Sequence, residues 1–299
     1  MSTTAAAAPA AAENTAATQQ PTAAEARRTA MEARVATQKR DVVHLFSYPR
    51  GPCLNLSPPC LKLEAYLRMT STPYVMHYTM SAESVSATER LPYAEINGEG
   101  VADSQFIIER VQDVFKLDKD EGLSKEQRAK GHAIRRVIET SAYFGIERSM
   151  MVDNLAAVGD VWAPLFGPMP RATLDGILAE MRQGVITALN NQGNGDLTDA
   201  QYHAEWVKDL SAVETLIGDS DFALGNKPTS VDAAIFGSLD VTRALGELTG
   251  NTQPAVKFIR DSAVLSAYLA RVEAVCFPDA KAVIAAAAAG PMDDQAFVA

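Results

Sequence analysis

The chain has 299 residues, of which 47% are hydrophobic and 21% charged, a balance typical of one large globular domain or two ordinary ones. The formal net charge of −10 argues against a binder of nucleic acid or of anionic membranes, because such proteins present a basic surface. Three cysteines, an odd number in a long chain, favour a reducing compartment, and we expect a cytoplasmic protein. Four dispersed histidines predict no metal site, and no apolar run reaches the roughly 18 residues of a membrane span.

Residues 1–40 are expected to form an N-terminal tail, disordered at first and charged toward its end. The first 22 residues lack the large apolar side chains that fill a core. Residues 23–40 fit a short charged helix. A mitochondrial presequence is the alternative reading, since such segments are amphipathic and rich in arginine, but Glu13, Glu25 and Glu32 count against it.

Residues 41–118 alternate strand-like and helix-like segments, which predicts an α/β sheet. β-Branched and aromatic residues mark the strands, and a tight turn leads into the last of them. We expect strands in VVHLFSY (42–48), PYVMHYTM (73–80), YAEIN (93–97) and GEGVA (98–102), and helices over 60–69 and 103–115.

Residues 119–280 have helical periodicity throughout and predict an all-helical domain, with a C-terminal tail over 281–299. Three capping boxes, in which two side chains satisfy each other's unpaired N–H groups, mark helix starts. They are Ser124–Gln127, Thr198–Gln201 and Thr229–Asp232.

The stretch LSPPCLKLE (56–64) places two prolines where a helix should begin. Ser57 occupies the N-cap position, Pro58 and Pro59 remove donors that would have no partner, and Cys60 follows. One interpretation is a simple helix cap. The other is functional, because the positive end of a helix stabilises a thiolate of the protein or of a ligand.

Two further positions suit ligand binding. Pro92 directly precedes a strand, where an X-Pro bond is a candidate for the cis isomer. Asp103 and Ser104 open a helix, and they either cap it or bind an amino group and a carboxylate.

Together, these features resemble the glutathione transferase superfamily, and the chain looks most like its failed-axon-connections and metaxin-like branch. The resemblance rests on Ser-Pro-Pro-Cys opening a first helix, Leu-Pro before the third strand, Asp-Ser opening a later helix and Thr-x-x-Asp in the helical region. It covers about residues 41–280 and implies a thioredoxin-like N-terminal domain followed by an all-α C-terminal domain.

The resemblance also implies roles for individual residues. Ser57 matches the residue that activates the glutathione sulfur, with Cys60 as the alternative catalytic residue and otherwise tucked inward. Leu91 and Pro92 match the cis-proline site that pairs with the cysteinyl part of glutathione. Asp103 and Ser104 match the pair that holds the γ-glutamyl end, although the family more often has Glu in place of Asp.

Three functions follow as hypotheses. The first is a transferase that uses glutathione as co-substrate and conjugates it to a small electrophile, with Tyr143, Phe144, Trp162 and Phe166 as a pocket or as plain core. The second is a non-catalytic adaptor that binds a protein partner, as expected for the failed-axon-connections branch. The third is thiol exchange at Cys60 or Cys53. A homodimer is common in the superfamily, and the sequence leaves the oligomeric state open.

Overall fold

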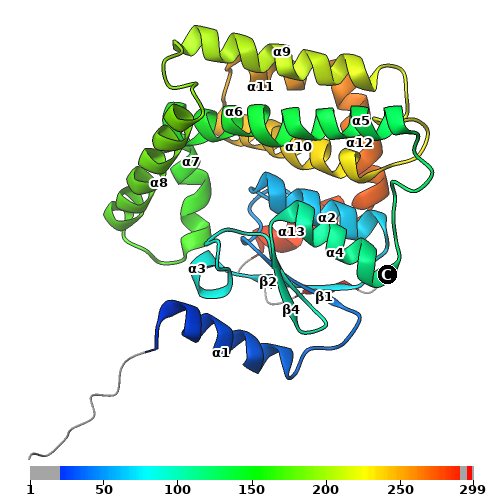
Figure 1. The fold of residues 1–299 in the computed structure, drawn as a ribbon. Coiled ribbons are helices and arrows are strands. Elements are labelled where there is room, and N and C mark those ends of the chain that lie inside the picture. Colours follow the sequence, from blue (N-terminus) through cyan, green and yellow to red (C-terminus); the bar gives the residue numbers. More distant parts are fainter. Residues whose placement is uncertain (1–20, 290–294, 298–299) are drawn as a thin grey trace, which may run out of the picture.

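The computed structural model describes residues 21–289 and 295–297, and it is built in layers (Figure 1). A mixed five-stranded sheet has the order β4-β3-β1-β2-β5. Strands β1 and β2 run parallel, and the other neighbours run antiparallel. The strands are β1 (Val43–Ser47), β2 (Tyr74–Tyr78), β3 (Tyr93–Ile96), β4 (Glu99–Ala102) and β5 (Gln295–Phe297).

Helices cover both faces of this sheet (Figure 1). On one face lie α2 (Pro58–Met69) and α4 (Ser104–Phe115), and on the other lies α1 (Ala23–Val35). A short helix, α3 (Ala82–Val85), follows β2. Because both faces are covered, all five residues of β1 are buried. This arrangement confirms the expected α/β domain.

The rest of the described chain is helical, as predicted. The two π-helical segments, η1 and η2, flank α6, and π-helical turns in proteins frequently occur at functional sites. The elements are α5 (Lys125–Arg136), η1 (Val137–Ala142), α6 (Tyr143–Arg148), η2 (Ser149–Asp153), α7 (Leu155–Trp162), the 3₁₀ turn η3 (Ala163–Phe166), α8 (Arg171–Asn191), α9 (Asp199–Ile217), α10 (Ser230–Thr249), α11 (Pro254–Asp261), α12 (Ala263–Cys276) and α13 (Ala280–Ala288).

All three predicted capping boxes are present. The most buried of them opens α10. There the Asp232 carboxylate accepts hydrogen bonds from the Thr229 N–H at 2.7 Å and the Thr229 hydroxyl at 2.8 Å. It also accepts from the Ala223 N–H at 2.8 Å and the Tyr268 hydroxyl at 2.6 Å. Asp232 therefore ties the preceding loop and α12 to the start of α10.

The junction between the sheet region and the helical region is the packing of α10 on α2. Most residues of α10 are buried, and Gly237 lies where its helix approaches the backbone of α2 closely. A Cβ atom at Gly237 would be 2.6 Å from the Pro58 carbonyl oxygen and 2.7 Å from the Lys62 nitrogen. Only glycine permits this approach, which fixes the first turn of α2 against the helical region.

Two segments differ from the expected tails. The charged segment at the N-terminal end forms the expected helix, α1, but Arg34 of this helix and Gln38 just beyond it hold the segment on the sheet through Glu95 of β3. At the other end, α13 and β5 lie within the predicted C-terminal tail, and β5 pairs with β2 as the outermost strand of the sheet. The reason is that both ends find partners on the sheet, which composition alone does not reveal. The predicted disorder of residues 1–20 falls outside the described residues.

Candidate functional site

The register of the sheet brings several of the predicted site residues to one end of its strands. This end, where β1 and β4 finish and β3 begins, is called the sheet edge below. Phe46 of β1 lies opposite Tyr93 of β3, and Tyr93 lies opposite Ala102 of β4. Pro92, which precedes β3, and Asp103, which follows β4, are therefore at the same end of adjacent strands. The loop that leaves β1 at this edge leads to the first turn of α2.

Ser57 begins α2 in an extended conformation, as an N-cap residue does. Within the described helix, however, its hydroxyl makes no capping hydrogen bond to the backbone. Its side chain lies close enough to the Cys60 thiol to oppose the increase in the pKa of that thiol. The Ser57 N–H is held by the Asn55 side chain at 2.9 Å, and Asn55 in turn donates to the Ser47 hydroxyl at 3.2 Å. The Ser57 backbone is thus fixed by its neighbours, whereas its hydroxyl is not used to cap α2.

The Cys60 side chain points inward and is fully buried. Burial raises the pKa of its thiol, whereas hydrogen bonds from the Ser57 and Ser47 hydroxyls and the Tyr48 backbone oppose that increase. Cys53 is also buried and donates to the Asn55 carbonyl oxygen at 3.2 Å, and burial raises its pKa to about 12. Neither cysteine has the exposed, low-pKa character of a reactive thiol.

The Leu91–Pro92 peptide bond is cis, as its position before β3 suggested. Leu91 is buried in a small apolar cluster that lies between the sheet edge and the start of α2. This cluster, called the edge cluster below, consists of Phe46, Cys60, Ala82, Leu91 and Tyr93, with Tyr48, Val85 and Ala102 packed against it. Leu91 and Cys60 therefore belong to the same packing unit, and Cys60 lies in the first turn of α2, which Ser57 precedes.

Asp103 and Ser104 are at the start of α4. Asp103 has a positive φ of 76°, and its carboxylate accepts a hydrogen bond from the Gln105 N–H at 2.8 Å, which is the capping arrangement. Ser104 is buried. A residue other than glycine at positive φ is uncommon, and such strain often accompanies a functional position.

Lys62 lies beside this helix start, and the sequence analysis did not identify it. Its ammonium group pairs with Glu139 of η1 and hydrogen-bonds the Gln105 side chain at 3.0 Å. Burial lowers the pKa of Lys62, and the Glu139 carboxylate opposes that decrease. Lys62 therefore places a positive charge between α2, α4 and the helical region.

A second group of polar side chains includes two residues of α6 and two residues of the loops that follow β1 and precede β3. The pKa of Tyr48 is raised to about 12, mainly by burial and to a smaller extent by the neighbouring acidic groups of Cys60 and Glu147. Burial also raises the pKa of Glu147, against a hydrogen bond with Tyr143 and the charge of Arg90. Tyr143, proposed from the sequence as a pocket residue, is thus part of a polar group near the edge cluster.

A buried arginine supports the loop between β1 and α2. Arg50 donates to the Tyr78 hydroxyl at 2.9 Å, to the Leu54 carbonyl at 2.5 Å and to the Glu64 carboxylate at 2.5 Å. Its side chain is 1% exposed and that of Glu64 0%, so the pair depends on its mutual charge and hydrogen bonds. This pair fixes the path of the chain toward Ser57.

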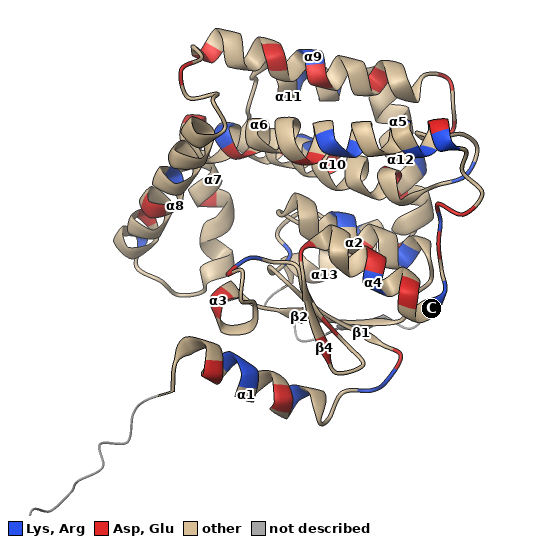
Figure 2. Cartoon of the chain, in the orientation of Figure 1, with Lys and Arg blue, Asp and Glu red and all other residues tan. Residues whose placement is uncertain are grey.

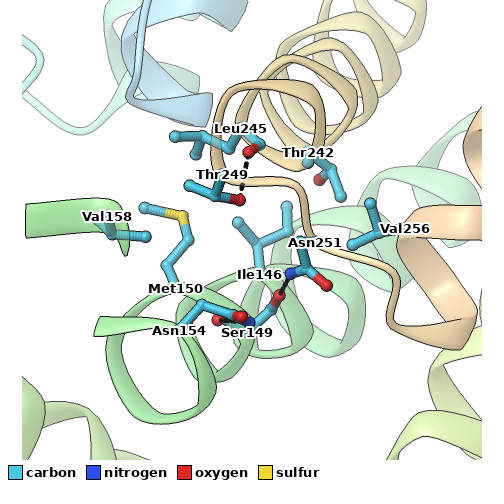
Figure 3. A pocket seen from close by; sticks show the side chains of 11 residues that line it. Ile146, Ser149, Met150, Asn154, Val158, Thr242, Leu245, Thr249, Asn251 and Val256 are labelled. Atoms are coloured by element: carbon cyan, nitrogen blue, oxygen red, sulfur yellow. Dashed lines mark hydrogen bonds between the residues drawn. The ribbon is translucent and has the colours of Figure 1, made fainter. Parts of the chain in front are cut away.

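One small cavity lies in the helical region, away from the sheet edge (Figure 3). Ile146, Met150 and Val158 line it on one side, and residues from the end of α10 line the other. Its polar wall is a hydrogen bond from Asn251 Nδ2 to Ser149 Oγ at 2.8 Å. None of the predicted site residues lines this cavity.

The described residues contain no group of three or more His, Cys, Asp or Glu side chains placed to hold a metal ion. Over the same part of the chain, no helix is long and apolar enough to span a membrane.

Comparison with known proteins agrees with the fold. The model of the glutathione S-transferase N-terminal domain matches residues 58–155, and that of the C-terminal domain matches residues 206–272. Isoprene-epoxide–glutathione S-transferase of Rhodococcus is 30% identical over 197 residues, which cover 62% of this chain and 79% of the relative. A glutathione transferase of Phanerochaete chrysosporium has a TM-score of 0.54 at 12% identity, over 79% of this chain and 98% of that chain.

The chain therefore belongs to the glutathione S-transferase superfamily. Within it, the chain is similar to Failed axon connections of Drosophila melanogaster, with 26% identity over 253 residues. That match covers 81% of this chain and 59% of the relative, so the chain spans less than two thirds of the relative's length. These matches place it near the failed-axon-connections branch of the superfamily.

Proposed function

We propose that this protein binds glutathione at the sheet edge and conjugates it to a small electrophile. The observation that carries the proposal is the Ser57 hydroxyl, which stands at the positive end of α2 and caps no N–H group of that helix. Leu91, Pro92, Asp103 and Ser104 lie around the same edge of the sheet. We assign the cysteinyl part of glutathione to the first two and the γ-glutamyl part to the last two.

In this proposal, the Ser57 side chain turns its hydroxyl toward the glutathione sulfur and donates a hydrogen bond to it. The dipole of α2 and this hydrogen bond both favour the thiolate, which then attacks the electrophile. Asn55 keeps the Ser57 backbone in place and so limits the rearrangement to one side-chain rotation. Positioning then supplies much of the rate enhancement.

The electrophile would lie on the side of the helical region that faces Ser57. Tyr143, Glu147 and Arg90 lie close enough there to influence the pKa values of Tyr143 and Glu147, and a polar group of this kind suits an electrophile that develops negative charge on oxygen. The name of the Rhodococcus relative, which refers to an epoxide, points to the same class of compound. We therefore propose small epoxides as the first electrophiles to test.

A non-catalytic role as a protein-binding adaptor is the second candidate. It is favoured by the similarity to Failed axon connections, which extends over 81% of this chain. In this role the glutathione site would be vestigial or would only stabilise the fold. Phe106 of α4 is 62% exposed and is a candidate contact for a partner or for a second copy of the chain.

The three unpaired cysteines suit a reducing compartment such as the cytoplasm.

The transferase proposal predicts a different response from two neighbouring residues. Ser57→Ala should lower kcat/KM for conjugation by about 100-fold, because one donor to the developing or ground-state thiolate is lost. Cys60→Ala should retain activity within about threefold, provided that the variant folds, because Cys60 is buried and takes no part in the chemistry. The measurement is the conjugation rate with glutathione and a panel of epoxides. Loss of activity in Cys60→Ala but not in Ser57→Ala would favour thiol exchange, and no activity in the wild type would favour the adaptor.

A further inference from the structure

Helix α1 is attached to the sheet through one buried carboxylate. Glu95 of β3 is completely buried, and Arg34 of α1 binds it in a forked arrangement with Nε at 3.1 Å and Nη2 at 2.5 Å from Oε1. Gln38 donates to the other carboxylate oxygen at 2.5 Å. Such a charge-assisted, two-pronged contact fixes direction as well as position. By contrast, Arg28 on the same helix makes only an exposed pair with Glu32 at 3.9 Å.

Other contacts extend from α1 to the edge cluster. The Arg34 guanidinium lies 5.1 Å from the centre of the Phe46 ring, and the Tyr93 hydroxyl contacts the Met31 sulfur at 3.5 Å. Phe46 and Tyr93 pack with Cys60 and Leu91 in the edge cluster. Helix α1 therefore contacts Phe46 and Tyr93, two members of the cluster that supports the candidate glutathione site.

The N-terminal part of α1 also reaches α3. Arg27 donates to the Glu83 carbonyl oxygen at 3.2 Å. Ala82 of α3 belongs to the edge cluster, and Val85 packs against it. The chain then leads to Leu91 and Pro92. Figure 2 shows the mixed charge of α1, which is consistent with a helix attached by polar contacts rather than by an apolar face. No residue of α1 is fully buried, so these few contacts hold it.

We propose that α1 is a brace for the glutathione site: through Glu95 and α3 it fixes the segment 79–92, which ends in the Leu91–Pro92 bond. Without the brace, residues 79–92 still pack on the edge cluster through Ala82 and Leu91, but they lose their contact with α1. Arg34 and Glu95 are positioning residues and touch no ligand. The effect on ligand affinity rests on the function proposed above, whereas the effect on the segment itself does not.

Hydrogen exchange of the full chain tests the brace directly. In Arg34→Gln, we expect amides of residues 79–92 to exchange roughly tenfold faster, with no change in α12, because local opening becomes easier without global unfolding. Arg28→Gln is the matched control, since it removes a charge from the same helix without touching Glu95, and it should behave as the wild type. Arg27→Ala leaves the buried carboxylate paired and should speed exchange in α3 by a smaller factor.

Glutathione affinity is the second readout. We expect Arg34→Gln to raise the dissociation constant about threefold to tenfold and Arg28→Gln to leave it unchanged. Unchanged exchange in 79–92 for both Arg34→Gln and Arg27→Ala would overturn the brace, as would a rise that is uniform over the whole chain including α12. If the wild type binds no glutathione, the proposed function fails, and the exchange comparison still decides whether α1 braces this segment.

Discussion

At the scale of single residues, Ser57 and Cys60 have opposite environments although they are only three positions apart. The Ser57 hydroxyl is at the start of α2 and is free of any capping bond within that described helix, whereas the Cys60 thiol is fully buried among apolar side chains. A sulfur in that environment favours the neutral thiol, because burial penalises the thiolate. The residue that suits thiol activation is therefore the serine.

The buried cysteines give a prediction about thiol chemistry. Burial raises the pKa of both Cys53 and Cys276 from an ordinary 9.0 to about 12, and it raises the pKa of Cys60 as well. At pH 8 we therefore expect almost no reaction of the native protein with a chromogenic disulfide reagent over several minutes, and three thiols after denaturation. Fast reaction of one native thiol at neutral pH would contradict this environment and would revive the thiol-exchange hypothesis.

The raised pKa values of the thiols also determine how the free energy of unfolding changes with pH. A thiol whose pKa is higher in the folded chain than in the unfolded chain stabilises the fold fully below the unfolded value. That contribution is lost as the pH rises from about 9 toward 12, because the unfolded chain releases its protons first.

Residues whose positions follow from a local sequence pattern could be predicted. Residues whose partners are distant in the sequence could not. Ser57, Pro92 and the three capping boxes are local patterns, and their positions follow from helix and strand ends. Lys62 and Glu95 are ordinary charged residues in the sequence. Their importance comes from Glu139 and Arg34, which are 77 and 61 positions away. Only the folded chain brings these partners together.

At the scale of elements, the contact of α10 with α2 joins the candidate site to the helical region. The sequence predicted both helices but not their close approach, since a glycine inside a helix has no distinctive local signature. Likewise α1 was expected as a charged helix within a tail, and its attachment to β3 depends on the buried Glu95 carboxylate and on the contact of Met31 with Tyr93. Packing of this kind is decided by shape and charge between distant segments.

The close approach predicts an effect of added volume at Gly237. Gly237→Ala should lower the free energy of unfolding by about 1–3 kcal/mol, because the new methyl group meets the backbone of α2, which cannot rotate away. It should also weaken glutathione binding by displacing the first turn of α2. Urea unfolding measures the first effect and calorimetry the second.

A matched control is available in α8. A Cβ atom at Gly176 would meet nothing within 4 Å, so Gly176→Ala should stabilise the protein by about 0.5–1 kcal/mol through helix propensity alone. Equal effects of the two substitutions would show that helix packing at Gly237 is looser than the structure indicates.

At the scale of the whole molecule, the sheet region and the helical region share one continuous core, which extends from β1 and α2 to α10 and α12. The sequence predicted this two-part architecture because strand-like and helix-like periodicities change near residue 120. It did not predict β5 or α13, whose segment is rich in alanine and carries little pattern. The candidate site lies at one edge of the sheet next to the junction, so its geometry depends on both regions.

The central claim is that glutathione binds at this sheet edge. Calorimetric titration of the full chain with reduced glutathione tests it most directly, with the wild type beside an Asp103→Ala, Ser104→Ala double variant. We predict saturable binding by the wild type and at least a tenfold weaker affinity in the double variant, because the γ-glutamyl end loses its polar partners. Absence of binding by the folded wild type at millimolar glutathione, or equal binding by both proteins, would contradict the claim.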